Sequence, residues 1–320
     1  MSYGKEIITE IAKLYYEEGM TQAEISTRLG ISRPIVSRRL MEARESGIVK
    51  IFISSNEVNM TDLERRLFST FNLKGVKVVD VPEDDGELAV ELTARAGADY
   101  LKDFLEPGDC VGVDWGWTIN MLTSSFSQYD SGVDTVVQCA GNMNDVQIKS
   151  SPDGTIKAFA AKLRAKHAYS LSVPIMVENR IIANTLRYDK RIEQTLNCLD
   201  RCNKFIVNIA LAGEGSCLYN LGYINDSDVA RLNAEGVLGS ICCRFFNSEG
   251  KICDTDLEER TISISLNQLK KAECVMSCLS GKKKAPPVYY ALRHGLINVA
   301  VLDSLLATSV LDLAAADAAR

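Results

Sequence analysis

Hydrophobic residues recur at helical spacing near the amino end of the chain. Between residues 5 and 18 they stand three or four positions apart, which predicts an amphipathic helix that ends at Gly19. Apolar residues then return at Ile25 and Leu29, and again at Val36, Leu40 and Ala43. Gly30 lies between these two groups, and glycine readily adopts the left-handed conformation that ends a helix. The pattern therefore predicts two further short helices joined by a tight turn.

Polar residues mark the starts of both short helices. Thr21 precedes the first one and is followed three residues later by Glu24, the order of a capping box. Ser32 precedes the second one as its N-cap, and Pro34 is tolerated in the first turn because an N–H there has no partner within the helix. This arrangement predicts a helix-turn-helix motif, whose second helix enters the major groove of DNA.

The second of these helices is basic on the side that faces away from its apolar residues. We expect Arg33, Ser37 and Arg38 to contact bases or phosphates, and Gln22 and Arg44 to contact the DNA backbone at the edges of the groove. The residues predicted to contact DNA are Gln22, Ser32, Arg33, Ser37, Arg38 and Arg44. Arg39 departs from the pattern, since an apolar residue is expected there. The alternative is an ordinary helical hairpin with a solvated basic face.

Beyond Gly47 the pattern of apolar positions changes twice. Residues 48–55 (IVKIFISS) alternate in part, which predicts the strand of a small wing, so that residues 1–55 form a winged helix-turn-helix domain and residues 56–60 a linker. From residue 61 to residue 320 short apolar segments alternate with longer amphipathic ones. The predicted strands are 76–81, 110–115, 135–140, 171–177, 205–210, 237–246, 261–266, 274–279 and 297–302. The predicted helices between the first of them are 87–105, 118–126, 157–167 and 187–202.

This alternation predicts a second, larger α/β domain. Strands that are apolar almost throughout belong to a mostly parallel sheet with helices on both faces, an α/β/α Rossmann-like arrangement. Sheets of this kind bind ligands at the carboxyl ends of their strands. Residues 61–320 are therefore predicted to bind a ligand at that edge.

Charge and composition narrow the range of functions. The formal net charge is −6, yet residues 21–50 carry six basic and three acidic side chains, a local charge of +3. A basic face confined to one segment of an acidic chain suits binding to selected DNA sites. We find neither a secretory signal nor an apolar run of the roughly 20 residues that would cross a membrane, so we expect a cytoplasmic protein.

Cysteine usage predicts neither a disulfide framework nor a metal site. Many of the ten cysteines lie within apolar runs, where they resemble small buried hydrophobic residues. The pairs Cys198/Cys202 and Cys274/Cys278 have three residues between them instead of the two that are typical of zinc sites. We therefore expect no metal and no cofactor.

Three predicted strand ends carry residues that suit an anion. Residues 112–118 (GVDWGWT) form a glycine-containing turn into a helix, residues 138–144 (QCAGNMN) offer small residues and amides, and residues 280–284 (SGKKK) place three lysines before a helix. Lysines at that end oppose the helix dipole, and a bound phosphate would relieve this. Alternatively, the glycines are ordinary features of an α/β domain, the lysines are solvated, and Trp115 and Trp117 belong to the core. Together the three segments favour a small phosphorylated ligand.

The same residues resemble the SorC-type sugar-binding transcriptional regulators over nearly the whole chain. The resemblance is carried by residues 11–51 in the amino-terminal part, and by GVDWGWT, GVLGSICCRFFNSEGKI and SGKKKAPPVYYALRHGLINVAVLDSLLA in the larger part. It implies an effector domain similar to sugar-phosphate isomerases and CoA transferases, assembly into a homodimer or homotetramer, and a changed arrangement on operator DNA when a phosphorylated sugar binds.

The resemblance also implies which residues bind the effector. The phosphate-binding strand end falls on Gly112–Thr118, a small glycine loop on Ala140–Asn142, and a ligand lysine on Lys284, while Asn247 stands where similar regulators usually have an aspartate. The expected effector-binding residues are Gly112, Asp114, Trp115, Gly116, Thr118, Gln138, Gly141, Asn142, Asn247 and Lys284.

Two other functions remain open from the sequence. A sugar-phosphate isomerase would use an acid or base at a strand end, for which Asp114 and Lys284 are candidates, but neither belongs to a recognisable catalytic constellation and an isomerase has no need of residues 1–50. A constitutive DNA-binding protein would use the larger domain only for assembly. We expect a regulator that is not an enzyme, with double-stranded operator DNA and a phosphorylated sugar as its partners and no membrane association.

Overall fold

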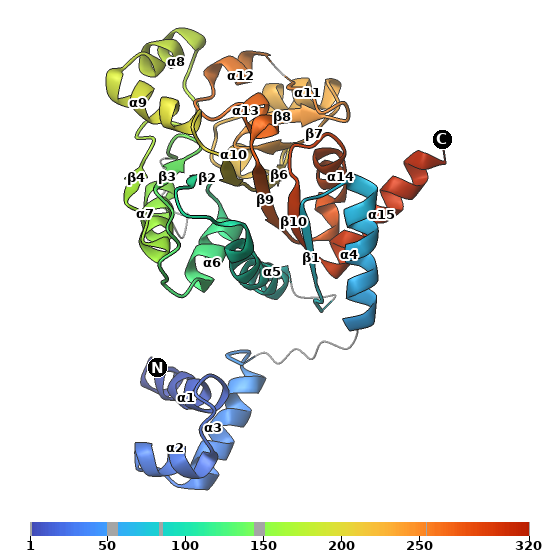
Figure 1. Cartoon of the computed structure of the whole chain (residues 1–320). Coiled ribbons are helices and arrows are strands. Elements are labelled where there is room, and N and C mark those ends of the chain that lie inside the picture. Colours follow the sequence, from blue (N-terminus) through green and yellow to red (C-terminus); the bar gives the residue numbers. More distant parts are fainter. Residues whose placement is uncertain (1, 50–56, 83–85, 144–150, 254, 320) are drawn as a thin grey trace. The chain divides into compact units, whose positions relative to one another are not determined.

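The chain divides into two compact units, residues 1–55 and residues 56–320 (Figure 1). The structure is a computed structural model and describes residues 2–49, 57–82, 86–143, 151–253 and 255–319. Among these residues, no helix has both the length and the apolar character that crossing a bilayer requires.

The smaller unit contains the predicted three helices, α1 (Ser2–Tyr16), α2 (Gln22–Leu29) and α3 (Arg33–Glu45). They enclose a core that includes Ile11, Leu14, Ile25, Val36 and Leu40. The predicted capping box is confirmed, because the Thr21 hydroxyl accepts from the N–H of Glu24 and the Glu24 carboxylate accepts from the N–H of Thr21 at 2.8 Å. Gly30 follows α2 with φ of 64°, the left-handed conformation expected of it. The sequence therefore predicted these three helices and the capping box of α2.

The predicted wing strand lies mostly outside the described residues, and the predicted linker overlaps a helix. Most of the wing strand falls on residues 50–56, which lie outside the described residues. Val49 belongs to no strand, and its N–H donates to the carbonyl of Ala43 at the end of α3. The linker was predicted too long, since residues 57–60 form the first turn of α4 (Glu57–Phe71). This helix belongs to the larger unit, where its Leu67 is fully buried in the core.

A seven-stranded parallel sheet forms the centre of the larger unit. Its strands lie in the order β1-β10-β9-β5-β2-β3-β4, and every neighbouring pair is parallel, as predicted. The strands are β1 (Gly75–Val79), β2 (Cys110–Val113), β3 (Thr135–Gln138), β4 (His167–Tyr169), β5 (Lys204–Ile206), β9 (Cys274–Leu279) and β10 (Val299–Asp303). Because the sheet is parallel, the carboxyl ends of its strands meet at one edge.

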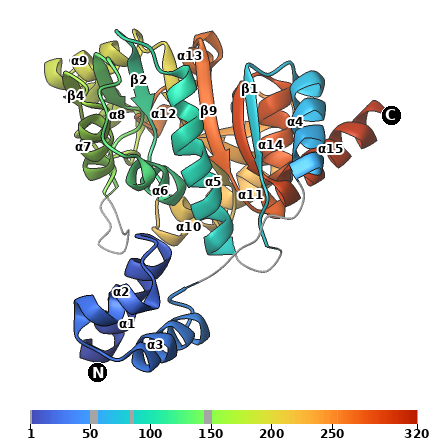
Figure 2. The same ribbon diagram turned by 60° about the horizontal axis from the view of Figure 1, so that its bottom comes forward.

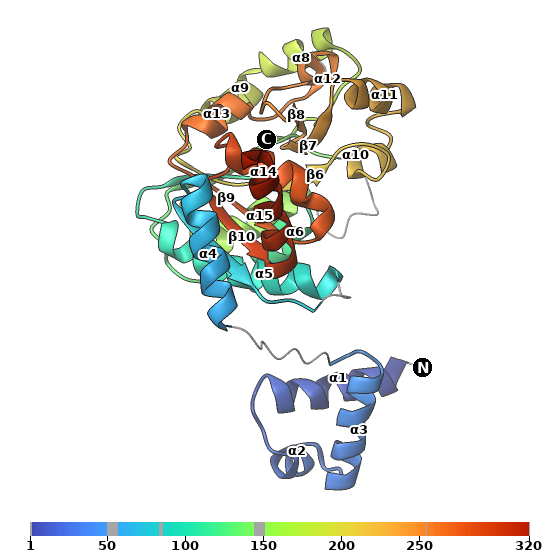
Figure 3. The ribbon, with the colours of Figure 1, turned by 90° about the vertical axis from the view of Figure 1, so that its right-hand side faces the viewer.

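Helices cover both faces of this sheet and bury two separate cores. One face carries α5 (Gly86–Leu101), α6 (Trp117–Ser125) and α7 (Pro152–Leu163), with α5 and α6 in front of the strands in Figure 2. The other face carries α4, α14 (Ala285–Arg293) and α15 (Ser304–Ala318), which come forward in Figure 3. Successive residues of β10 contribute to opposite cores, Val301 to the first and Leu302 to the second. This alternation explains why the strands are apolar throughout.

Further elements lie between the strands. They are η1 (Lys102–Phe104), α8 (Arg180–Arg187), α9 (Lys190–Leu199), α10 (Cys217–Asn220), α11 (Asp226–Ala234), α12 (Thr255–Arg260), α13 (Leu266–Lys271) and η2 (Lys282–Lys284). The predicted helix 187–202 corresponds to α9, which is shorter at both ends, and α8 before it was not predicted. Asp189 separates them because its side chain accepts from the N–H groups of Arg191 and Ile192 and so begins a new helix.

A second, three-stranded antiparallel sheet was not predicted. It consists of β6 (Ile209–Leu211), β7 (Val237–Ile241) and β8 (Arg244–Asn247). The predicted strand 205–210 breaks after Ile206, so that β5 and β6 belong to different sheets. The predicted strand 237–246 is a hairpin whose turn residues, Cys242 and Cys243, have φ of 49° and 61°. Left-handed cysteines are uncommon, and no glycine or asparagine marked the turn in the sequence.

Two predicted strands, 171–177 and 261–266, are irregular segments. They meet only through isolated bridges such as Met176 to Thr261, and Pro174 has no N–H to donate to a ladder. The buried side chain of Arg244 donates to the carbonyl groups of Glu258 and Ser263, at 2.7 and 2.9 Å. These carbonyl groups are satisfied by a guanidinium instead of by a neighbouring strand.

Candidate functional site

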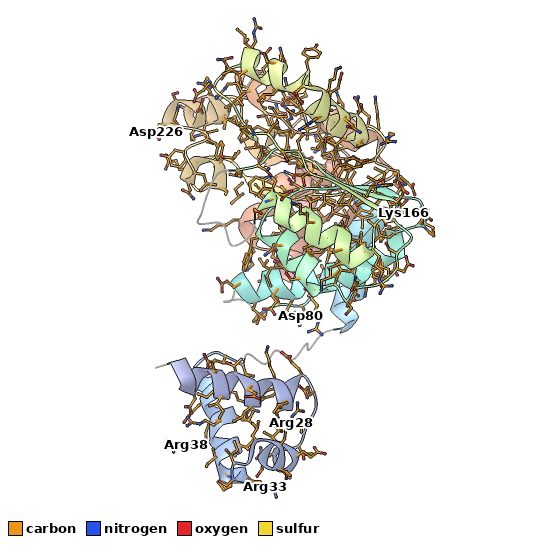
Figure 4. All side chains as sticks on the ribbon, turned by 90° about the vertical axis from the view of Figure 1, so that its left-hand side faces the viewer. Arg28, Arg33, Arg38, Asp80, Lys166 and Asp226 are labelled. Atoms are coloured by element: carbon orange, nitrogen blue, oxygen red, sulfur yellow. The ribbon has the colours of Figure 1, made fainter. Side chains whose placement is uncertain are left out.

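The start of α3 presents polar side chains to solvent. Ser32 occupies the N-cap position, as predicted, but its hydroxyl makes no capping hydrogen bond. Arg33, Ser37 and Arg38 are exposed, and Figure 4 shows Arg33 and Arg38 at the periphery of the smaller unit. These are the side chains that a helix in the major groove presents to DNA.

Arg38 is the most informative of these side chains. It is 77% exposed, and its Nε lies 3.2 Å from Oε1 of Glu42. The other oxygen of Glu42 binds Nη1 of Arg39 at 2.5 Å, and this bond, ahead of the one from Arg38, lowers the pKa of Glu42. At the position where an apolar residue was expected, the guanidinium of Arg39 therefore forms an ion pair with Glu42. An exposed pair of this kind contributes little energy, so Arg38 is available to a phosphate or a base.

The two residues expected at the edges of the groove lie in different settings. Nε of Arg44 donates to the hydroxyl of Tyr16 at 2.8 Å, and its guanidinium lies 5.8 Å from the centre of the Tyr16 ring. These contacts join the end of α3 to α1 and keep the Arg44 side chain extended. Gln22 is half-buried at the first position of α2.

In the larger unit a cavity of about 410 Å³ opens at the carboxyl ends of β2 and β5, against the small sheet. Asp114 and Trp115 directly follow β2, and Asn208 follows β5. The lining residues are Asp114, Trp115, Gly116, Trp117, Asn208, Ala210, Leu211, Ser216, Cys217, Leu218, Ser240, Cys242 and Cys243. The cavity is therefore mostly apolar with a few polar groups, the composition of a small-molecule site.

Three polar atoms in the wall of this cavity lack a partner. They are Oδ1 of Asp114, Nε1 of Trp115 and Oδ1 of Asn208, all of them buried. The other carboxylate oxygen of Asp114 accepts from the N–H of Asn208 at 3.2 Å. Burial raises the pKa of Asp114 to about 6, opposed by hydrogen bonds from the backbone N–H groups of Trp115 and Asn208. Unpaired buried polar atoms are costly, so they mark the places where a ligand would bond.

The helix α6 begins at the cavity wall. Gly116 is its N-cap residue, with φ of 130°, and no side chain caps the first turn. A Cβ atom on Gly116 would lie 3.2 Å from Nδ2 of Asn208, so a larger residue would crowd the amide as well as strain the backbone. The N–H groups at the start of α6 therefore remain open to an anion.

Seven of the ten predicted effector-binding residues do not line this cavity. A Cβ atom on Gly112 would lie 2.3 Å from the ring of Phe205, and one on Gly141 would lie 2.7 Å from the carbonyl oxygens of Val173 and Pro174. These glycines permit close packing. Thr118 is buried within α6.

The three amide side chains also have structural roles. Gln138 donates to the Ala140 carbonyl and to Oδ1 of Asn142, at 2.6 and 2.9 Å. Oδ1 of Asn247 accepts from the N–H groups of Glu249 and Lys251, which forms the turn after β8. The prediction therefore found a ligand loop only at the end of β2, because these amides bond to their own loops.

Lys284 lies near the cavity without lining it. It ends η2, which packs beside β6, the strand that supplies Ala210 and Leu211 to the cavity wall. Burial lowers the pKa of Lys284 to about 8, opposed by the charge of Asp303. Within the described part of the chain its amino group makes no hydrogen bond or ion pair, whereas Asp303 accepts from the N–H of Gly281 at 2.6 Å.

Ten of the thirteen residues in the cavity wall are not among those predicted to bind the effector. Asn208 was taken as the middle of a strand, and Ser240, Cys242 and Cys243 as parts of another. For Asn208 a signal existed, because a polar residue that follows an apolar strand in a parallel sheet lies at the ligand-binding edge. Ser216 caps the short helix α10, which begins at Cys217, and the sequence offered no such signal for these two residues.

The chain is similar to known transcriptional regulators over nearly its whole length. Residues 55–312 match the family model described as "Putative sugar-binding domain", and residues 9–46 match that of sigma-70, region 4. The chain is 31% identical to the sorbitol operon regulator of Klebsiella pneumoniae over 305 residues, 92% of this chain and 94% of that protein. It is 28% identical to the deoxyribonucleoside regulator of Bacillus subtilis, with 96% and 98% covered.

A solved structure matches both units. The crystal structure of the full-length sorbitol operon regulator SorC from Klebsiella pneumoniae has a TM-score of 0.75 and 29% identity to this chain. The match covers 97% of this chain and all of that one. A regulator of the DeoR family from Listeria monocytogenes matches 79% of the chain, with a TM-score of 0.71 and 25% identity.

Proposed function

The chain belongs to the SorC family of sugar-binding transcriptional regulators, and from this premise we propose that a phosphorylated sugar, bound in the cavity of the larger unit, controls the binding of α3 to operator DNA. In this proposal the protein is a regulator and not an enzyme.

The observation that carries the effector part is the set of three unpaired polar atoms in the cavity wall. The hydroxyl groups of a sugar both donate and accept hydrogen bonds. Two of them donate to Oδ1 of Asp114 and Oδ1 of Asn208, and an oxygen of the ligand accepts from Nε1 of Trp115. The faces of Trp115 and Trp117 suit the apolar side of a sugar ring. A polyhydroxylated ligand thus provides a hydrogen-bond partner for each of the three unpaired atoms.

The phosphate is assigned to the start of α6. Its first turn has no side-chain cap, and Gly116 allows the phosphate to approach the backbone closely. No lysine or arginine belongs to the described residues of the cavity wall, so backbone N–H groups supply most of the positive potential. Lys284, in η2 beside β6, is the candidate for additional charge.

The DNA part depends on the exposed side of α3. Arg33 and Arg38 bind guanine edges or phosphates, and Ser37 contacts a base or a phosphate between them. Ser32 and Gln22 lie at the amino ends of α3 and α2, where they fix the register of the helices on the DNA backbone, together with Arg44.

Control requires an assembly with two arrangements. We place two or four copies of the chain on paired half-sites, a homodimer or a homotetramer, because a two-fold operator matches a two-fold protein. The sugar phosphate acts by binding one arrangement of the subunits more tightly than the other. In the disfavoured arrangement the α3 helices no longer match the spacing of the half-sites.

The effector part is tested by thermal unfolding with a panel of pentose and hexose phosphates and their unphosphorylated parents. We expect at least one phosphorylated sugar at about 100 times its dissociation constant to raise the melting temperature of the larger unit by roughly 5 to 10 °C, since binding stabilises the folded state by mass action. The parent sugar should have a much smaller effect, because it lacks the anion that α6 binds.

Matched variants locate the effect in the cavity. Asn208→Ala removes an unpaired acceptor and should abolish the shift, whereas Asn247→Ala removes an amide outside the cavity and should retain it. If no sugar phosphate changes the melting temperature, the larger unit serves only for assembly and the protein is a constitutive DNA-binding protein. Turnover of any panel member, followed by NMR, would establish the isomerase alternative.

The DNA part is tested on duplexes selected from a random pool by the full-length protein. The double variant Arg33→Ala/Arg38→Ala should bind the selected duplex at least about 30-fold more weakly, since each contact to a base contributes about 1–3 kcal/mol. Arg28→Ala is the control, because Arg28 lies at the end of α2 and is paired with Glu18 at 3.1 Å. Equal losses in the double variant and the control would contradict the assignment of α3 as the recognition helix.

A further inference from the structure

Two cysteine thiols lie unusually close together at the edge of the sheet opposite to the cavity. Cys110 is the first residue of β2, and Cys202 precedes β5 by two residues. Their sulfur atoms are 3.1 Å apart, although 92 residues separate them in sequence. Both are free thiols. We propose that this pair is an oxidation site, at which a peroxide converts the two thiols into a reversible disulfide bond.

The backbone around the pair is fixed by neighbouring strands. β2 and β5 are adjacent and parallel, with Val111 opposite Lys204. Asn203 bonds to Cys110 on both sides: its N–H donates to the Cys110 carbonyl and its Oδ1 accepts from the Cys110 N–H, each at 3.1 Å. A disulfide requires the sulfurs to approach by about 1 Å more, to roughly 2.05 Å. Rotation of the two side chains can supply this movement without displacing either strand.

The two thiols differ in access and in reactivity. Cys110 is half-buried, whereas Cys202 is 8% exposed. The hydrogen bond from the Cys202 thiol lowers the pKa of Cys110, burial opposes this, and the charge of Arg201 adds to the lowering. Arg201 is held in place, since its Nη2 lies 3.1 Å from Sγ of Cys198. Cys110 is thus the thiol that ionises and reacts first with the peroxide. Cys202 is the resolving thiol, which then forms the disulfide.

The chemistry balances with a peroxide as the oxidant. The Cys110 thiolate attacks one peroxide oxygen, so that an S–O bond forms, the O–O bond breaks and the departing oxygen leaves as water after taking a proton. The resulting sulfenic acid is attacked by the Cys202 sulfur. The S–S bond forms, the S–O bond breaks, and the proton of Cys202 leaves with the hydroxyl as a second water. Thiol reagents reverse the reaction by exchange.

The cysteines at the cavity edge of the sheet differ from this pair in burial and position. Cys139 and Cys242 interact, but both are fully enclosed, and burial raises the pKa of both thiols. Cys217 is exposed in the cavity wall, at the opposite edge of the sheet from Cys110 and Cys202. Oxidation by low concentrations of peroxide is therefore expected to select Cys110.

The bond would join two strands that also shape the cavity. β2 leads to Asp114 and β5 leads to Asn208, so a link between the opposite ends of these strands stabilises the pair of strands that positions both residues. A bond that closes a loop of 92 residues restricts the unfolded chain strongly. The oxidised larger unit should therefore melt at a higher temperature than the reduced one.

The test uses the full-length Cys217→Ser protein, which lacks the exposed thiol that would otherwise link two molecules. After treatment with hydrogen peroxide, we expect two fewer titratable thiols, a peptide map that joins Cys110 to Cys202, and a melting temperature raised by about 5 °C or more. Dithiothreitol should reverse all three changes. Cys253→Ser is the matched control and should still form the bond, because the Cys253 thiol donates to the Lys251 carbonyl and contacts neither member of the pair.

Cys110→Ser and Cys202→Ser, each in the Cys217→Ser background, should lose the cross-link and the reversible rise in melting temperature. The inference is overturned by an unchanged thiol count, by a cross-link between other cysteines, or by oxidation of Cys110 to a sulfinic acid without a cross-link. Because the peptide map is measured on the parent protein, the result stands even where a serine variant folds poorly.

Discussion

At the scale of single residues, Asp114 stands out because its carboxylate is buried and one of its oxygens has no hydrogen-bond partner among the described residues. Its side chain is only 4% exposed, one oxygen has no partner, and no described basic side chain lines the cavity. A carboxylate in this setting destabilises the folded state whenever it is ionised. A ligand that donates a hydrogen bond to Oδ1 offsets part of this effect. Asp114 therefore lowers the stability of the ligand-free protein and favours binding of the ligand.

The predicted consequence is a pH-dependent gain in stability on Asp114→Asn. The folded-state pKa of about 6 exceeds the ordinary value of 3.8, so the stabilising proton is bound below pH 4 and lost as pH rises through 6. Above pH 6 the carboxylate costs about 3 kcal/mol, and the amide should recover roughly 2 kcal/mol of it. Urea unfolding of both proteins between pH 4.5 and 8 measures this difference.

The comparison needs no ligand and has a clear control. Asp312→Asn changes a carboxyl group on α15, far along the chain from the cavity residues, and its effect should not change across this pH range. A loss of stability in Asp114→Asn at pH 8, or a difference that is the same at all pH values, would show that the carboxylate is well solvated.

At the scale of elements, the turn between α2 and α3 sets the geometry of the DNA-binding unit. Gly30 has φ of 64° and ends α2, its N–H donates to the Ser26 carbonyl, and the Ser26 hydroxyl in turn donates to the carbonyl of Ile31. A Cβ atom on Gly30 would meet nothing within 4 Å. Its role is therefore conformational, and a substitution acts through the backbone alone.

Gly30→Ala should destabilise the smaller unit by about 1 kcal/mol, and Gly30→Asn by less, because asparagine tolerates the left-handed region better than alanine. Circular dichroism during thermal unfolding measures the loss. Gly86→Ala is the control: this glycine begins α5, has open space around it and no left-handed backbone, so alanine there should be neutral or slightly stabilising. Equal effects at the two positions would contradict the conformational explanation.

The same scale shows what the sequence could predict. Periodicity and caps located α1, α2 and α3, and apolar runs located β1, β2, β3, β9 and β10, because each of these elements is specified by its own residues. The hairpin of β7 and β8 was missed because two left-handed cysteines make its turn. Segments 171–177 and 261–266 were misread because the partners of their backbone, including Arg244, are distant in sequence.

The candidate site also has a part that local sequence predicts and a part that it does not. The loop from Asp114 to Gly116 was predicted because its glycine and its place after a strand are local features. Asn208 and Ser240 face the same cavity only because β6 leaves the main sheet and pairs with β7. That departure depends on packing between distant segments, so no local pattern reports it.

At the scale of the whole molecule, charge is distributed so that DNA binding depends on few contacts. Residues 21–50 carry +3, and since the chain as a whole carries −6, the remaining residues carry −9. The acidic remainder repels DNA outside the contact made by α3, which weakens binding to random sequence more than binding to an operator. Affinity should therefore be strongly dependent on salt, with a slope set by a small number of basic side chains.

This distribution makes the salt dependence of binding a direct count of phosphate contacts. The logarithm of the association constant should fall linearly with the logarithm of salt concentration, by about 0.9 for each phosphate neutralised. If Arg38 binds a phosphate, Arg38→Ala should reduce the slope by about 0.9. If it binds a base, the slope stays and the preference among duplexes relaxes instead. Arg28→Ala, whose guanidinium is already paired with Glu18, should change neither quantity. Titrations of a selected and a random duplex at several salt concentrations separate these outcomes. If Arg28→Ala reduced both the salt slope and the preference among duplexes, the contact surface would lie on α2 and not on α3.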